Sequence, residues 1–234
     1  MSDDHRRTEV FSSVPMSYSR DDFLRKIRIG DDPELRRSAE QLLDRAERIA
    51  RPKGMYRVGY ITGRSDGGVE IDGVSFTSRP LAVNLSEVER VFPFIMTCGV
   101  ELDELQLDGD ELLTSFWLDS LKQAALTAAR NYVRERIADR FGLEVEKLTS
   151  MNPGSADREV WPIEQQRGLF SLFGDVEGLI GVRLTDSFLM VPNKTVSGIY
   201  FPTEVSWVNC QLCTRELCLN RKAPYTGRAV GDEE

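Results

Sequence analysis

Apolar residues recur at helical spacing between residues 33 and 49. Most members of this stripe stand three or four positions apart: Leu35, Ala39, Leu42, Leu43, Ala46 and Ile49. This spacing places them on one face of an α-helix. Asp32 followed by Pro33 is typical of a helix start, and Arg51-Pro52 ends the pattern. We therefore expect an amphipathic helix that turns one face to the core.

A longer helical pattern runs from about residue 110 to residue 141, and Gly142 is placed to end the helix. Shorter helices are expected after Ser19 as far as Gly30, over residues 85–91 and over residues 163–173. Each has a start signal in front of it: Ser19 with Asp22, Asn84 with Glu87, and Pro162.

Strand patterns fall between these helices. We expect a strand over residues 56–62, a hairpin over residues 69–76 with Asp72-Gly73 at its turn, and a buried strand over residues 92–97. Residues 150–155 have the composition of a loop. Strand-like segments follow at residues 180–184, 187–191 and 195–201.

Helices and hairpins segregate along the chain rather than alternating as βαβ units, which favours an α+β fold. We expect a flexible N-terminal arm over residues 1–18, a single α+β domain over residues 19–205, and a cysteine-containing C-terminal extension over residues 206–234.

Composition narrows the range of partners and locations. The net charge is −8, which argues against nucleic acid as the main partner because binding phosphates requires a basic face. The chain has no apolar run of about 18 residues, so we expect no membrane span. The first residues lack the apolar segment of a signal peptide, so we expect a cytoplasmic protein.

The chain contains one histidine, His5, which lies in a polar and charged N-terminal stretch. A Ser-His-Asp triad and a histidine-rich zinc site of the hydrolase type both require imidazoles in the folded body. These site classes are therefore excluded. Any chemistry falls to carboxylate, tyrosine, lysine or cysteine side chains, or to a bound cofactor.

Three of the four cysteines are clustered: Cys210, Cys213 and Cys218 form a C-x₂-C-x₄-C motif. Thiolates at this spacing suit zinc or an iron–sulfur cluster, and Cys98 is the remaining cysteine that could complete a four-thiolate site. The alternative is that Cys210, Cys213 and Cys218 are reduced thiols without a metal and that Cys98 belongs to a buried strand end.

The segment from residue 152 to residue 201 carries a family signature. Its parts are Pro153-Gly154, the run EQQRGLFSLF at residues 164–173, the run IGVRLTDSFLMVP at residues 180–192, and TVSGIYF at residues 195–201. In order and spacing, these stretches resemble the activation domain of cobalamin-dependent methionine synthase.

The resemblance implies an α+β fold with a twisted antiparallel sheet flanked by helices. It also implies binding of S-adenosylmethionine and docking onto cobalamin carried by a partner, a corrinoid-binding methyltransferase or methionine synthase module. There an electron from a reductase and the methyl group restore the methylated corrinoid. A chain whose only histidine is His5 cannot supply the cobalt ligand, so this protein would be a stand-alone relative.

By the same resemblance, the S-adenosylmethionine site comprises Pro153, Gly154, Gly198, Tyr200 and Phe201. The arginine and tyrosine of the family's Arg-x-x-Pro-Gly-Tyr motif correspond to Ser150 and Ser155 here. An arginine pairs with a carboxylate through a bidentate fork, which serine cannot do. Candidates for this role elsewhere in the chain are Arg130, Arg158 and Arg167.

Two further functions remain open at this point. The protein could bind a corrinoid protein as an adaptor without using S-adenosylmethionine, as Ser150 indicates. It could instead carry electrons to the corrinoid through an iron–sulfur cluster at the cysteines.

Overall fold

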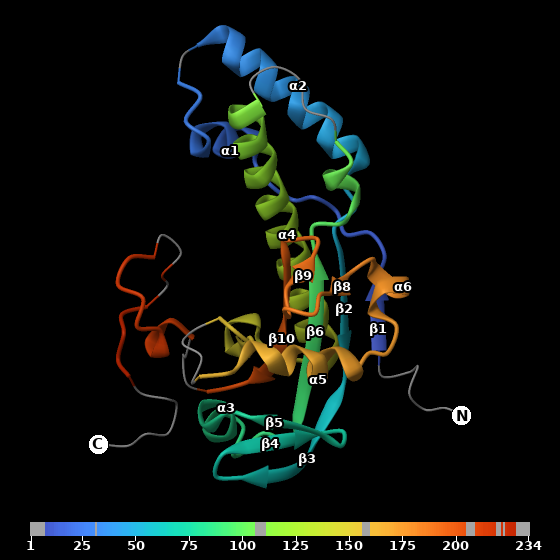
Figure 1. The fold of residues 1–234 in the computed structure, drawn as a ribbon, viewed down its shortest axis with the longest axis vertical. Coiled ribbons are helices and arrows are strands. Elements are labelled where there is room, and N and C mark those ends of the chain that lie inside the picture. Colours follow the sequence, from blue (N-terminus) through green and yellow to red (C-terminus); the bar gives the residue numbers. More distant parts are fainter. Residues whose placement is uncertain are drawn as a thin grey trace.

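The computed structural model describes residues 8–30, 32–105, 111–155, 160–204, 209–218, 221 and 223–227. Within these residues a long antiparallel sheet runs through the molecule, and helices cover both of its faces (Figure 1). The predicted α+β class with an antiparallel sheet is confirmed.

Strand β6 lies at the centre of the sheet. It pairs with β10 on one side and with β2 and then β3 on the other. Beyond these neighbours, β1 pairs with β2, β4 and β5 extend the sheet from β3, and β7 pairs with β10. The bounds are β1 Thr8–Phe11, β2 Lys53–Arg57, β3 Gly59–Ser65, β4 Gly68–Ile71, β5 Val74–Thr77, β6 Arg90–Thr97, β7 Leu148–Met151 and β10 Thr195–Pro202.

The single strand predicted from Tyr56 onward is divided between β2 and β3. Both strands keep one register along β6, from the pair Tyr56–Phe94 to the pair Gly59–Val91. The positions without ladder pairs to β6, Arg57 and Val58, lie opposite Pro93 and Phe92. Because proline has no N–H to donate, the ladder breaks at this position while the chain keeps its direction.

The helices follow their start signals, with one exception. Ser19 accepts a hydrogen bond from Asp22 N, and Asp32 accepts from Glu34 N and Leu35 N, so both predicted caps are confirmed. The bounds are α1 Arg20–Lys26, α2 Pro33–Ile49, α3 Arg79–Asn84, α4 Glu111–Phe141, α5 Gln166–Ser171 and α6 Val176–Ile180, with short 3₁₀ turns η2 Glu101–Asp103, η3 Val145–Lys147, η4 Ile163–Gln165 and η5 Asn209–Leu212.

The exception is the helix predicted over residues 85–91, which is wrong. Helix α3 ends at Asn84, where that helix was expected to begin. The cap is Ser78, whose hydroxyl accepts from Leu81 N at 3.0 Å and donates to Val160 O. A proline in the first turn fits this earlier start.

The segment after α5 is also less extended than predicted. Residues 180–184 contain the end of α6 and only the short strand β8 (Arg183–Leu184). Of residues 187–191, only β9 (Met190–Val191) is a strand, and it pairs with β8 outside the main sheet.

Part of the predicted flexible arm belongs to the sheet. Residues 8–11 form β1, which adds to β2. Glu9 accepts hydrogen bonds from Tyr56 Oη and Arg140 Nη1, both at 2.7 Å, and so ties β1 to β2 and α4. Burial, with help from Glu9, raises the pKa of Tyr56 to about 12, so the phenol stays a hydrogen-bond donor at neutral pH. Residues 1–7 lie outside the described residues.

The sheet separates two hydrophobic cores, and a third lies beyond its end. Met55, Ile95 and Ile199 face α3, α5 and α6. On the opposite face, Phe94 and Tyr200 pack with the second half of α4. The first half of α4 continues past the sheet and packs against α1 and α2 (Figure 1). Among the described residues, no helix is long and apolar enough to cross a bilayer.

The predicted hairpin is confirmed as β4 and β5. Its turn residues Asp72 and Gly73 both have positive φ, 47° and 83°, as a two-residue hairpin turn requires. The Asp72 carboxylate also accepts from Tyr60 N at 3.2 Å and pairs with Arg57 at 3.3 Å. The Arg57 and Asp72 side chains are only 9% and 12% exposed, so this pair joins the turn to β2 out of contact with most of the solvent.

We predict that Asp72→Asn lowers the free energy of unfolding by about 2 kcal/mol, because it removes the charged partner from an ion pair that is mostly out of solvent. Asparagine tolerates positive φ and keeps an acceptor for Tyr60 N. Urea denaturation measures the change. The control is Glu89→Gln, which removes the exposed Arg64–Glu89 pair and should cost less than about 1 kcal/mol. Equal losses in the two variants would contradict the prediction.

Candidate functional site

The candidate site lies at the sheet edge formed by β7 and the turn that follows it. Ser150 and Met151, expected in a loop, are the last residues of β7, because Tyr200 and Ile199 of β10 pair with them. In the turn, the Ser155 hydroxyl donates to Asn152 O at 2.8 Å. In the described residues, β7 pairs only with β10, so its other side is an edge.

Backbone groups of Ser150 face outward from this edge. Thr203 N donates to Lys147 O at 2.8 Å, which fixes the phase of the β7–β10 ladder. Hydrogen-bonded and non-hydrogen-bonded pairs alternate in an antiparallel ladder, so Thr149 bonds across to β10 while Ser150 turns its amide and carbonyl to the outer edge. Such an edge can hydrogen-bond a ligand through the main chain.

The turn after β7 depends on a positive φ at Gly154. This residue has φ +71°, and its N–H donates to Trp161 O at 2.9 Å. Pro153 is buried, whereas Gly154 and Ser155 are exposed. Pro153 therefore anchors the turn, and the next two residues lie at the surface.

Tyr200 lies behind this edge rather than on the surface. It is 3% exposed, and its ring stacks on Phe94 with centroids 4.3 Å apart. Burial raises the pKa of the Tyr200 phenol, and the charges of Arg130 and Arg134 oppose that rise. The Arg130 guanidinium, on α4, therefore lies close to this phenol.

Phe201 occupies the opposite face and is 1% exposed. Alternation along a strand would turn one of Tyr200 and Phe201 to solvent if one face of the sheet were open, yet both are buried. The two side chains do alternate, but helices cover both faces of the sheet: Phe201 packs on the α5 side and Tyr200 on the α4 side.

Gly198 is required by close packing, not by a positive φ. A Cβ atom there would lie 2.4 Å from Asn152 Nδ2 and from Met151 O, and 2.9 Å from Phe94 Cζ. The amide of Asn152 uses this space to donate to Ser197 O at 2.7 Å. The protein's own atoms therefore fill the space that a Cβ at position 198 would need.

The arginines expected to replace the family arginine have different places. Arg130 lies half-buried on α4 at the Tyr200 phenol. Arg167 stacks over the Phe188 ring at 4.9 Å on α5, and Arg158 lies outside the described residues. Of the two that the structure places, Arg130 is beside the strand pair that contains Ser150.

Sequence reasoning missed Arg134. Its Nε donates to Leu148 O at 3.1 Å, and its Nη2 donates to Val145 O. This side chain covers part of the β7 edge and fixes α4 along it. The signal in the sequence was its position one helical turn after Arg130, on the same side of α4.

The β7 edge and the helix behind it offer distinct polar groups. They are the Arg130 guanidinium, the outward backbone groups of Ser150, and the hydroxyls of Ser150 and Ser155. Groups of these kinds bind carboxylates and polar ligand atoms.

Comparison with known proteins bears on the fold. No protein-family model and no curated protein matches the sequence. Among solved structures, the crystal structure of the MetH reactivation domain bound to AdoHcy matches with a TM-score of 0.58 and 19% identity, over 86% of this chain and 80% of that chain. The chain has the fold of the MetH reactivation domain. The resemblance stated from residues 152–201 is confirmed, and the fold likeness extends over most of the chain.

The four cysteines are not assembled as a set of metal ligands. Among the described residues, no group of three or more His, Cys, Asp or Glu side chains is placed to hold a metal ion. Cys98 is fully buried with α2 and α4, and burial raises its pKa to about 12, assisted by Asp103. Cys210, Cys213 and Cys218 are half-buried in the C-terminal segment.

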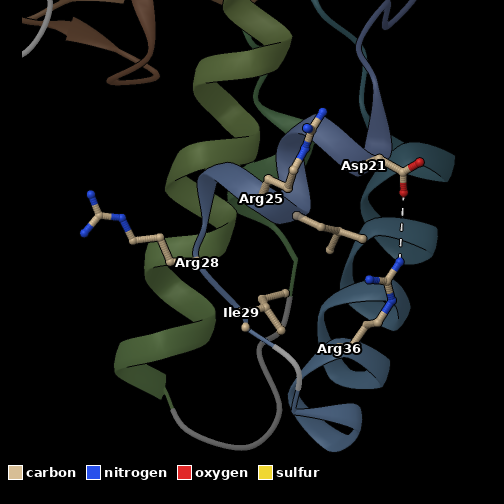
Figure 2. Close-up of a pocket in the computed structure, with 7 residues that line it drawn as sticks. Asp21, Arg25, Arg28, Ile29 and Arg36 are labelled. Atoms are coloured by element: carbon tan, nitrogen blue, oxygen red, sulfur yellow. Dashed lines mark ion pairs between the residues drawn. The ribbon is translucent and has the colours of Figure 1, made fainter.

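A cavity of about 590 Å³ lies elsewhere, between α1 and the start of α2 (Figure 2). Arg25, Arg28 and Arg36 line it, but Figure 2 shows their side chains pointing in different directions. Arg36 lies 3.9 Å from Asp21 and 3.0 Å from Glu40. These guanidiniums do not converge on one point, so the cavity lacks the arrangement that recognises an anion.

We predict that Gly198→Ala lowers the free energy of unfolding by about 2 kcal/mol or more, because the new methyl group displaces the Asn152 amide and the Phe94 ring. Thermal or urea unfolding measures the loss. Gly67→Ala is the control, since no atom lies within 4 Å of its Cβ position. It should change stability by less than about 0.5 kcal/mol. A Gly198→Ala protein as stable as Gly67→Ala would show that this packing is not tight.

Proposed function

We propose that this protein binds an S-adenosyl ligand at the β7 edge and assists the reductive methylation of a corrinoid carried by a partner protein. The observation that carries the proposal is the likeness, over 86% of the chain, to a reactivation domain crystallised with AdoHcy. The site at the β7 edge supports the proposal. The Arg130 guanidinium suits the carboxylate of an S-adenosyl ligand, and the outward backbone groups of Ser150 suit its other polar atoms.

Arg130 is the residue that we assign to the ligand carboxylate. The family arginine position is Ser150, and Ser150 pairs with Tyr200, whose phenol lies close to the Arg130 guanidinium. An arginine on α4 can therefore supply from the helix the charge that the family supplies from the strand. Asn152 and the turn at Gly154 shape the adjacent backbone.

S-adenosylmethionine, when bound, supplies a methyl group to a reduced corrinoid. The residues of this chain bind and orient: Arg130 fixes the carboxylate, and the Ser150 backbone fixes the ligand along the edge. The chain's single histidine is His5, in a polar and charged N-terminal stretch, so we assign the corrinoid and its cobalt ligand to the partner. An electron donor such as a reductase is required for the reductive step.

We predict that S-adenosylmethionine and S-adenosylhomocysteine both release or absorb heat on titration into the protein. Arg130→Gln should weaken each affinity about tenfold to a hundredfold, because it removes the charge from a charge-assisted pair and keeps only a neutral hydrogen-bond donor. Adding Ser150→Arg to this variant should restore binding, since the charge returns from the strand position. Calorimetry measures all three proteins.

The matched control is Arg136→Gln, on the same helix but paired with Asp139 at the exposed surface. Its affinity should equal that of the unchanged protein. If the unchanged protein binds neither nucleoside, with or without a cob(II)alamin-loaded partner, the methyl-donor role is refuted. Co-purification with that partner in the absence of nucleoside binding would then support the adaptor function, which the serine at position 150 favours.

An iron–sulfur electron carrier is the weaker alternative. The described residues contain no group of three potential ligands in place, so the thiols as folded do not fit a cluster.

A further inference from the structure

The C-terminal cysteines lie in a closed loop that the proposed function does not use. Thr226 N and Gly227 N both donate to Gln211 O, at 2.9 and 3.0 Å, and so close the loop at its base. Leu212 packs against the core on the α5 side of the sheet. Leu212 therefore anchors the loop to the sheet domain, and backbone hydrogen bonds close the loop at its base.

One side chain organises the interior of this loop. The Arg221 guanidinium donates to Cys210 O at 3.1 Å, to Cys213 O at 3.2 Å and to Ala223 O at 3.3 Å, and it also donates to Arg215 O. A guanidinium offers five donors in a planar fork, so it can hold several carbonyls at once. Arg221 thereby fixes the backbone on both sides of the Cys210–Cys213 turn.

Cys210 and Cys213 are joined by a tight turn. Cys213 N donates to Cys210 O at 3.3 Å, which closes the turn across three residues. The Cα atoms at the ends of such a turn are less than about 7 Å apart, and a disulfide needs Cα atoms about 4.4–6.8 Å apart. Cys218 belongs to a second turn, in which its carbonyl accepts from Arg221 N at 3.2 Å.

We propose that Cys210 and Cys213 form a dithiol–disulfide redox site that exchanges with disulfides. The thiolate of one cysteine attacks a disulfide R–S–S–R, which forms a mixed disulfide and releases one R–S⁻. The second thiolate attacks the mixed disulfide at the protein sulfur, which forms the Cys210–Cys213 bond and releases the other R–S⁻. The two cysteine protons pass to the released thiolates, and two electrons leave the protein. A dithiol reductant reverses the reaction.

The chain offers an internal control. Cys98 is fully buried and its pKa is raised to about 12, so it should react slowly with any thiol reagent in the folded protein. Cys210, Cys213 and Cys218 are half-buried and within reach of solvent. Disulfide exchange at Cys210 and Cys213 does not require S-adenosyl binding, so this proposal and the proposed function can be tested independently.

The test uses the full chain, purified under reducing conditions, with oxidised dithiothreitol or oxidised glutathione as the disulfide. We expect the mass to fall by two hydrogen atoms, two fast-reacting thiols to disappear, and peptide mapping to place the link between Cys210 and Cys213. Cys218→Ser should oxidise in the same way. Cys210→Ser and Cys213→Ser should lose the intramolecular link, with unfolding curves confirming that each variant is folded.

Three results would overturn the proposal. The first is no loss of thiols in the unchanged protein. The second is a link that maps to Cys218, or a Cys218→Ser variant that fails to oxidise. The third is stoichiometric zinc or iron in the purified protein that protects the thiols from oxidation, which would assign the loop to metal binding.

Discussion

The pairing of β6 with β10 is the constraint on which the other parts of this structure depend. The two strands stay in register from Thr195–Thr97 to Tyr200–Phe92. This register places the Phe94 ring over Gly198 and against the Tyr200 ring. A larger residue at position 198 would separate these groups, because neither the Met151 carbonyl nor the ring has room to move. The same two strands supply side chains to the cores on both faces of the sheet.

Helix α4 connects this packing to the candidate site. Its apolar positions cover the sheet, while Arg130 and Arg134 on the same helix reach Tyr200 and the edge carbonyl of Leu148. Tyr200 is buried and stacked on Phe94, so core packing sets the position of its phenol next to Arg130.

Local signals in the sequence predicted the elements well where a residue acts on its own neighbours. Ser19 and Asp32 cap their helices, and Asp72-Gly73 turns its hairpin, because each effect spans only two or three residues. The predictions that were wrong involve distant partners. Residues 85–91 resembled a helix, yet α3 starts earlier with Ser78, whose hydroxyl also bonds Val160 O. The division of β2 from β3 depends on Pro93, across the sheet.

The sequence by itself determined the α+β class, the family likeness, the exclusion of histidine chemistry and the residues around the β7 turn. Only the tertiary structure decided what those residues do. It buried both Tyr200 and Phe201, because both faces of the sheet are covered, and it filled the space at Gly198 with the protein's own atoms. It also placed Arg130 beside Tyr200 and Arg167 on Phe188, and it brought Cys210 and Cys213 together around Arg221. Such choices depend on contacts between residues far apart in the chain, which spacing along a sequence does not encode.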